Sequence, residues 1–136
     1  MLVREFIEGT TPDLAASKNL AQFAALLVDV HHRGVLTGDP NPGNWMRDPL
    51  GKPYFLDFGR ARTFPRHTPA YWFYLGKELT RVQHSACQRD PLRFQAFMRA
   101  YRNEAPLPTG WRLTLVQAGY RYWCRRRDMI PEPLAE

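Results

Sequence analysis

The sequence predicts a mainly α-helical domain of the α+β class, in which amphipathic helices accompany one small β-hairpin. The chain has 136 residues, which suits a single domain, and 44% of them are apolar, enough for a core. Its apolar residues recur at helical spacing over most of the length, and strand patterns are confined to two short segments. This composition excludes disordered and fibrous proteins.

The first half of the chain predicts a strand, a helix and a hairpin in that order. Residues 1–9 alternate apolar and charged side chains up to a glycine, which is typical of a short strand. Residues 19–33 predict a helix closed by Gly34 as a left-handed cap. A turn-rich loop, 37–44, leads to two short runs, 45–47 and 54–56, that predict a hairpin. The predicted buried face of the helix contains Leu20, Phe23, Ala24, Leu27 and Val30.

After residue 65 the pattern is helical, and it predicts no further strand. Thr68 and Asp90 are each followed by proline, the signal of an N-cap with proline at the first helical position. A last helix is predicted from about Trp111 to Arg127. The predicted buried stripes are Trp72, Leu75, Leu79, Val82 and Ala86; Phe94, Phe97, Met98 and Tyr101; and Leu113, Val116, Tyr120 and Trp123.

Charge is distributed unevenly along the chain. Residues 1–64 carry 7 basic and 7 acidic side chains, so the net charge of +6 belongs to the rest, and arginine outnumbers lysine by 16 to 3. A solvated face is the favoured explanation of this charge, and a phosphate- or carboxylate-binding surface is the alternative. Cys87 and Cys124 lie far apart, which indicates neither a disulfide framework nor a zinc site. We expect a cytoplasmic protein, because the sequence has no signal peptide and no apolar run of about 18 residues.

Oxygen-bearing side chains gather around the predicted hairpin. Asp39 and Asn44 lie in the loop before it, and Asp57 follows its second strand, so the hairpin can fold Asp57 back beside the other two. Carboxylate and amide oxygens suit a hard cation, Mg²⁺ or Mn²⁺. Pro40 and Pro42 stiffen the loop. The same residues are common turn formers, so a plain surface turn remains an alternative.

The ordered set of helix, Gly-Asp-Pro-Asn-Pro-Gly-Asn (38–44), hairpin and Leu-Asp-Phe-Gly-Arg-Ala-Arg (56–62) resembles the catalytic loop and metal-binding segment of the protein-kinase-like superfamily. The Gly-Asp-x-x-Pro-Gly-Asn form is most similar to bacterial small-molecule and sugar kinases, such as aminoglycoside phosphotransferases and kinases of lipopolysaccharide core heptose or Kdo. Thr37 stands where the family usually has a structural histidine, and its hydroxyl could supply part of that hydrogen bonding.

The resemblance implies a kinase-like C-terminal lobe spanning residues 1–136. Residues 1–9 would be the hinge strand, 10–64 the catalytic loop and Asp-Phe-Gly segment, and 65–136 a helical subdomain. The sequence has no Gly-x-Gly motif and no lysine upstream of the hinge, so we expect the N-terminal lobe to be absent. We therefore expect little phosphate transfer by this chain alone, and either self-association or a separate N-terminal lobe as partner.

The resemblance also assigns roles to individual residues. Asp39 would be the catalytic residue that orients the attacking hydroxyl, and Asn44 and Asp57 would hold the metal ions that bridge the phosphates of ATP. The nucleotide would also meet the backbone of Glu5 and Ile7, with Asn41 near the transferred phosphate. The implied cofactors are ATP and Mg²⁺ or Mn²⁺.

The function expected from the resemblance is ATP-dependent transfer of the γ-phosphate to a hydroxyl. The acceptor would be a lipopolysaccharide core sugar or another small molecule, and an anionic glycolipid would bring at most peripheral contact with the inner membrane face. The alternative is a catalytically inactive kinase-like remnant that acts as a binding module. No nucleic-acid partner is expected, because positive charge without a motif is weak evidence for one.

Overall fold

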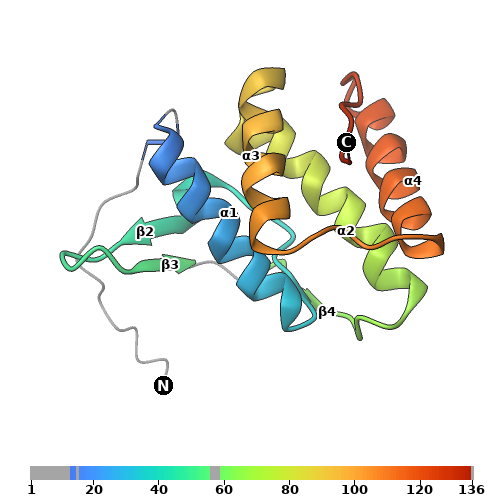
Figure 1. The fold of residues 1–136 in the computed structure, drawn as a ribbon, viewed down its shortest axis with the longest axis horizontal. Helices are drawn as coiled ribbons and strands as arrows, with labels where there is room; N and C mark the ends of the chain where they lie inside the picture. The colour runs from blue at the N-terminus through green and yellow to red at the C-terminus, as the bar shows by residue number, and fades with distance from the viewer. Residues whose placement is uncertain (1–12, 15, 56–58, 136) are drawn as a thin grey trace.

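The computed structural model describes residues 13–14, 16–55 and 59–135, and it confirms a mainly helical chain with little β-structure (Figure 1). Its four α-helices are α1 (Ser17–His32), α2 (Pro69–Arg81), α3 (Pro91–Glu104) and α4 (Trp111–Arg126). Helix α2 packs against α4, and α1 packs against α3. The predicted strand at residues 1–9 lies outside the described residues.

The helices begin and end close to the predicted positions. Gly34 has a φ of +77° after α1, as a left-handed cap requires. Asp90 caps α3, because its side chain accepts a hydrogen bond from the backbone N–H of Leu92 at 3.0 Å. Thr68 precedes α2 but does not cap it, since its hydroxyl donates to the carbonyl of Pro65 at 2.7 Å. The regular helix α2 gives way to a π-helical turn, η2 (Val82–Ala86).

The predicted hairpin is confirmed as strands β2 (Trp45–Arg47) and β3 (Pro53–Phe55), paired antiparallel. Asp48 organises its turn, because its Oδ1 accepts hydrogen bonds from the N–H groups of Leu50 and Lys52, both at 2.9 Å. A second pair, β1 (Val35–Leu36) with β4 (Arg62–Thr63), is also antiparallel. The sequence patterns did not predict this pair, since strands of two residues carry no measurable alternation.

The core follows the predicted stripes except at Val30, Leu113 and Trp123, which are only half-buried. In place of Val30, Val28 and His31 take buried positions on that face of α1. All predicted stripe residues of α2, η2 and α3 are buried, as are Val116 and Tyr120 of α4. Cys87 and Cys124 are buried free thiols, and burial raises the pKa of Cys87 to about 12. None of the described helices is long and apolar enough to span a bilayer.

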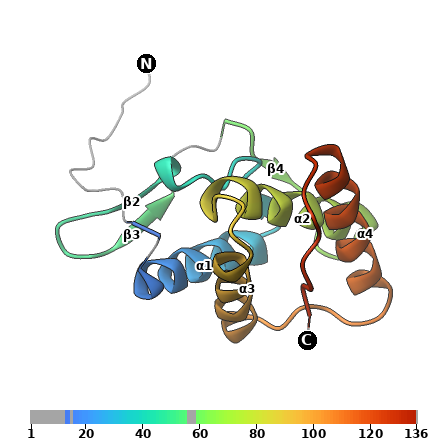
Figure 2. The same cartoon turned by 90° about the horizontal axis from the view of Figure 1, so that it is seen from above.

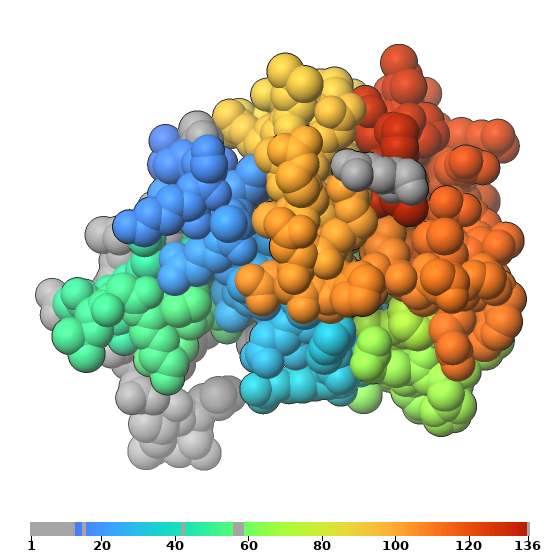
Figure 3. Space-filling view, in the orientation of Figure 1, coloured from blue at the N-terminus to red at the C-terminus, as the bar shows by residue number. Residues whose placement is uncertain are grey.

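The elements form an elongated arrangement with the hairpin at one end and α4 at the other (Figures 2 and 3). Helix α2 runs between them, so one of its sides meets α4 and another meets the loop that follows β1. The loop carrying the predicted site residues is therefore held against the central helix.

Candidate functional site

The loop between β1 and β2 is fastened by its own hydrogen bonds. The N–H of Asn41 donates to the carbonyl of Asp39 at 2.8 Å, and the N–H of Asn44 donates to the carbonyl of Asn41 at 2.9 Å. The side-chain oxygen of Asn41 accepts from the N–H of Gly43 at 2.9 Å. A short 3₁₀ turn, η1 (Pro42–Asn44), completes the loop. These bonds, with the restricted backbone of the prolines, give the loop a defined shape.

Two of the six predicted site residues, Asp39 and Asn44, lie side by side in this loop. The Asn44 side chain donates through Nδ2 to the carbonyl of Asp39 at 3.2 Å, and the same nitrogen lies 3.5 Å from Oδ2 of the Asp39 carboxylate. Both side chains are half-buried. Both contacts use the Asn44 nitrogen. Among the described residues, no hydrogen bond to its oxygen, Oδ1, is found, so this oxygen is available to bind a metal ion or another group.

The remaining predicted site residues divide into two groups. Asp57, Glu5 and Ile7 lie outside the described residues. Asn41 is exposed, and its side-chain oxygen is engaged in the turn of the loop. The described residues contain no group of three His, Cys, Asp or Glu side chains that could hold a metal. That finding does not bear on the predicted set, because this set includes an asparagine and Asp57.

The hairpin register nevertheless directs the chain back to the loop. Phe55 pairs with Trp45, which directly follows Asn44. Phe55 is two residues before Asp57 in the sequence. The last described residue before that aspartate therefore lies opposite the end of the loop that carries Asn44.

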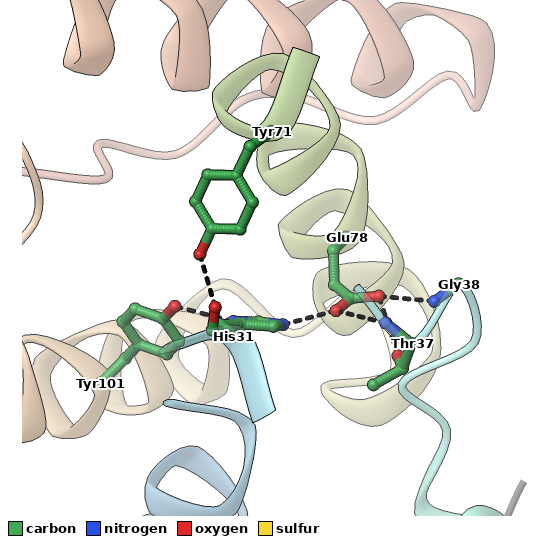
Figure 4. A network of polar contacts seen from close by, with 6 residues as sticks. All are labelled: His31, Thr37, Gly38, Tyr71, Glu78 and Tyr101. Carbon is green, nitrogen blue, oxygen red and sulfur yellow. Dashed lines mark hydrogen bonds and ion pairs between the residues drawn. The ribbon is translucent and has the colours of Figure 1, made fainter. Parts of the chain in front are cut away.

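A buried carboxylate from α2 anchors the start of the same loop (Figure 4). Oε1 of Glu78 accepts hydrogen bonds from the Thr37 hydroxyl and from the N–H of Gly38, both at 2.8 Å. Oε2 accepts from the N–H of Thr37 at 3.0 Å and lies in very close contact with Nε2 of His31. Glu78 is only 2% exposed. Thr37 and Gly38 are the two residues directly before Asp39, so Glu78 positions the loop at the predicted catalytic residue.

The anchor continues through His31 into two tyrosines. Nδ1 of His31 is hydrogen-bonded to the hydroxyl of Tyr101 at 2.7 Å, and the hydroxyl of Tyr71 donates to the backbone carbonyl of His31 at 3.0 Å. Burial raises the pKa of both tyrosines, so both hydroxyls stay protonated. The other ring nitrogen of His31, Nε2, faces the carboxylate and donates its N–H to Oε2 of Glu78.

Electrostatics keep Glu78 charged despite its burial. Burial alone would raise its pKa, but the hydrogen bond and charge of His31, together with two hydrogen bonds from Thr37, lower it overall. A charged acceptor forms stronger hydrogen bonds than a neutral one. The start of the loop is therefore held by charge-assisted bonds to a buried carboxylate.

Neither Glu78 nor His31 was among the predicted site residues. Both occupy the buried face of an otherwise apolar helical stripe: His31 follows Leu27 by four positions, and Glu78 follows Leu75 by three. An ionisable residue at such a position is a signal that could have been found, since buried charges are almost always paired. The Thr37 hydroxyl does form a supporting hydrogen bond, as expected, and its acceptor is Glu78, a residue that the family resemblance did not point to.

A close backbone approach fixes the loop from its other side. Gly38 has a φ of +76°, and a Cβ at this position would lie 2.3 Å from the carbonyl oxygen of Arg60. Only glycine satisfies both requirements. The segment after residue 58 is thereby held directly against the residue that precedes Asp39.

No protein-family model matches the sequence, and no curated protein matches it. The kinase-like interpretation therefore depends on the motif residues and on the geometry described above.

Proposed function

We propose that this chain carries the catalytic loop of an ATP-dependent phosphotransferase that transfers the γ-phosphate to a hydroxyl group. The observation that supports this most is the arrangement of Asp39 and Asn44. They lie in contact on a rigid loop, whose start is fastened by a buried carboxylate and whose end adjoins a hairpin leading to Asp57. Phosphoryl transfer depends mainly on positioning and charge neutralisation, for which such rigidity is suited.

In the proposed reaction, Asp39 orients the acceptor hydroxyl. The hydroxyl oxygen forms a bond to the γ-phosphorus as the bond to the bridging oxygen of ADP breaks, and the hydroxyl proton passes to the Asp39 carboxylate. Half-burial of Asp39 limits the water that competes with the acceptor.

Asn44 and Asp57 are the proposed metal ligands. The oxygen donors suit Mg²⁺ or Mn²⁺, and the Oδ1 of Asn44 is the atom left for this role. When bound, the ion neutralises charge on the phosphates of ATP. The backbone of Glu5 and Ile7, and the position of Asn41, are proposed to serve the nucleotide.

The acceptor is proposed to be a hydroxyl-bearing small molecule, such as a lipopolysaccharide core sugar. The compartment proposed is the cytoplasm, where ATP is available, with at most peripheral contact with the membrane. Self-association or a separate N-terminal lobe remains the proposed way in which the nucleotide is enclosed.

Paramagnetic broadening by Mn²⁺ in the presence of ATP tests the nucleotide and metal part of this proposal. Amide NMR signals of Asp39 and Asn44 should broaden first, because Mn²⁺ relaxes nearby nuclei most strongly. Asp57→Asn should abolish this local broadening, since one of two protein ligands is weakened. Asp29→Asn is the matched control, because Asp29 is an exposed carboxylate of α1 whose ion pair among the described residues is with Arg33 at 3.3 Å.

Transfer activity gives the second measurement. Asp39→Asn should remove phosphate transfer in the assembled enzyme and leave the Mn²⁺ broadening intact, since Asp39 acts on the acceptor. Broadening that is absent from the loop, or unchanged by Asp57→Asn, would contradict the proposal and favour a non-catalytic binding module.

A further inference from the structure

A cavity of about 350 Å³ opens beside the candidate site. It is bounded by Gly38, by the segment that follows residue 58 and by α2. Four cationic side chains line it, and we name it the cationic cavity after them: Arg60, Arg62, Lys77 and Arg81. Its volume lies in the range of small-molecule pockets.

The positive charge of the cationic cavity is not balanced by the described residues around it. Glu78 is the one acidic residue among those that line the cavity, and its carboxylate is taken up by the loop and His31. The ion pairs in the described part of the chain are His31 with Glu78 and Arg33 with Asp29, so neither involves the four cations. Unbalanced like charges in a cleft attract an anion.

Two of the four cations already contact aromatic rings without a ligand. The Lys77 ammonium lies 5.2 Å from the centre of the Trp123 ring, and the Arg62 guanidinium lies 6.0 Å from that of Tyr74. Nε of Arg81 is buried and has no hydrogen-bond partner among the described residues. A buried donor without a partner is costly, and a bound anion would remove that cost.

The environment of Lys77 also indicates an excess of positive charge in the cationic cavity. Its pKa is lowered, first by partial burial and then by the positive charges of Arg81, Arg62 and Arg127. A neighbouring anion would reverse the contribution of those charges. The cluster is therefore under mutual repulsion that a ligand of opposite charge relieves.

We propose that the cationic cavity binds a phosphate or carboxylate group carried by the acceptor, so that the acceptor of the proposed reaction is an anionic, hydroxyl-bearing molecule. This inference rests on the proposed function, because only that function makes the bound molecule a phosphate acceptor. The cavity touches Gly38, the neighbour of Asp39, whereas neither Asp39 nor Asn44 is among the described residues that line it. An anion held there lies next to Gly38, the neighbour of the proposed catalytic residue. The same charges disfavour cationic acceptors such as aminoglycosides or choline-like alcohols.

Titration with inorganic phosphate, followed by NMR of the whole chain, tests the cavity itself. Signals of Gly38, Lys77 and Arg81 should shift together. Lys77→Met and Arg81→Gln should each weaken phosphate binding by about tenfold, the effect of one lost charge-assisted hydrogen bond. Lys52→Met is the matched control for the lysine, because Lys52 also lies over an aromatic ring, that of Tyr54 at 5.3 Å, but in the hairpin turn. The exposed Arg125→Gln in α4 is the control for the arginine.

Three sugars test the class of acceptor. Glucose 6-phosphate should bind and shift the signals of the cationic cavity, whereas neutral glucose and cationic glucosamine should not. Equal binding of all three, or equal loss of phosphate binding in the Lys52→Met and Lys77→Met variants, would overturn the proposal.

A last experiment tests whether the cationic cavity binds an anionic group of the acceptor or a phosphate of the nucleotide. With ATP and Mg²⁺ present, phosphate binding at Lys77 and Arg81 should persist; displacement by the nucleotide would overturn the assignment to the acceptor. If Mn²⁺ broadening fails while the sugar phosphate still binds, the proposed transfer is wrong and the anion site stands. If Mn²⁺ broadens the loop signals but the sugar phosphate does not bind, the proposed anion site is wrong and the proposed transfer stands.

Discussion

Helix α2 meets two regions of the molecule in different ways. On the loop side, Glu78 holds Thr37 and Gly38 through directional hydrogen bonds to a buried charge. On the α4 side, the contact is steric: a Cβ at Gly76 would lie 2.3 Å from the carbonyl oxygen of Val116, and a Cβ at Gly119 would lie 2.1 Å from that of Phe73. One helix therefore combines an interface that specifies the geometry of a loop with an interface that brings two backbones into close contact.

The difference lies in what each kind of contact can specify. Close packing is short-ranged and tolerates no added volume, but it leaves the direction of a distant backbone N–H undetermined. A buried carboxylate accepts hydrogen bonds only along particular directions, and it is costly when any partner is missing. We expect the loop side to respond to charge and protonation, and the α4 side to respond to added atoms.

Removal of the Glu78 carboxylate should have the largest effect. Glu78→Ala leaves the N–H and hydroxyl of Thr37, the N–H of Gly38 and His31 without their acceptor, and we expect the free energy of unfolding to fall by about 3–5 kcal/mol. Urea unfolding measures this loss. Hydrogen exchange should also accelerate at Thr37 and Gly38 beyond the global change. A loss below about 1 kcal/mol would show that the carboxylate does not anchor the loop.

A single methyl group tests the α4 side. Helix propensity alone predicts that Gly119→Ala stabilises the chain by about 1 kcal/mol. The close approach to Phe73 predicts the opposite sign, a loss of about 2 kcal/mol. Ala118→Gly, at the exposed neighbouring position, measures the propensity contribution separately. Thermal or urea unfolding that shows Gly119→Ala to be stabilising would contradict the close contact.

Acid is the mildest way to perturb the loop side. The folded pKa of Glu78 is lowered from its ordinary value of 4.5, so the unfolded chain takes up the proton first as the pH falls. The stability contributed by this carboxylate is fully present above pH 4.5 and is lost as the pH falls through the lowered folded pKa. Glu78→Gln should flatten the pH dependence of urea unfolding in this range. An unchanged slope in that variant would assign the acid sensitivity to other carboxylates.

Elements with local signals were predictable from the sequence. The cap at Asp90 and the left-handed Gly34 depend on residues close in sequence, and both are confirmed. The hairpin was predictable because Asp48 and Gly51 supply its turn within four residues. The pairing of β1 with β4 was not, since Val35 and Thr63 are far apart in sequence and neither has a local pattern that points to the other.

In the candidate site, too, the features that depend on residues close in sequence were predictable, and those that depend on distant residues were not. The sequence by itself determined which residue types are present, the rigidity of the loop around Asp39 and the adjacency of Asn44, because these follow from turn chemistry over a few residues. Only the tertiary structure decided that Glu78, some forty residues later, fastens this loop, and that cations from two separated segments line one cavity beside it. Hydrogen bonds and electrostatic fields act over ångströms in space, and helix packing sets which distant residues come within that reach.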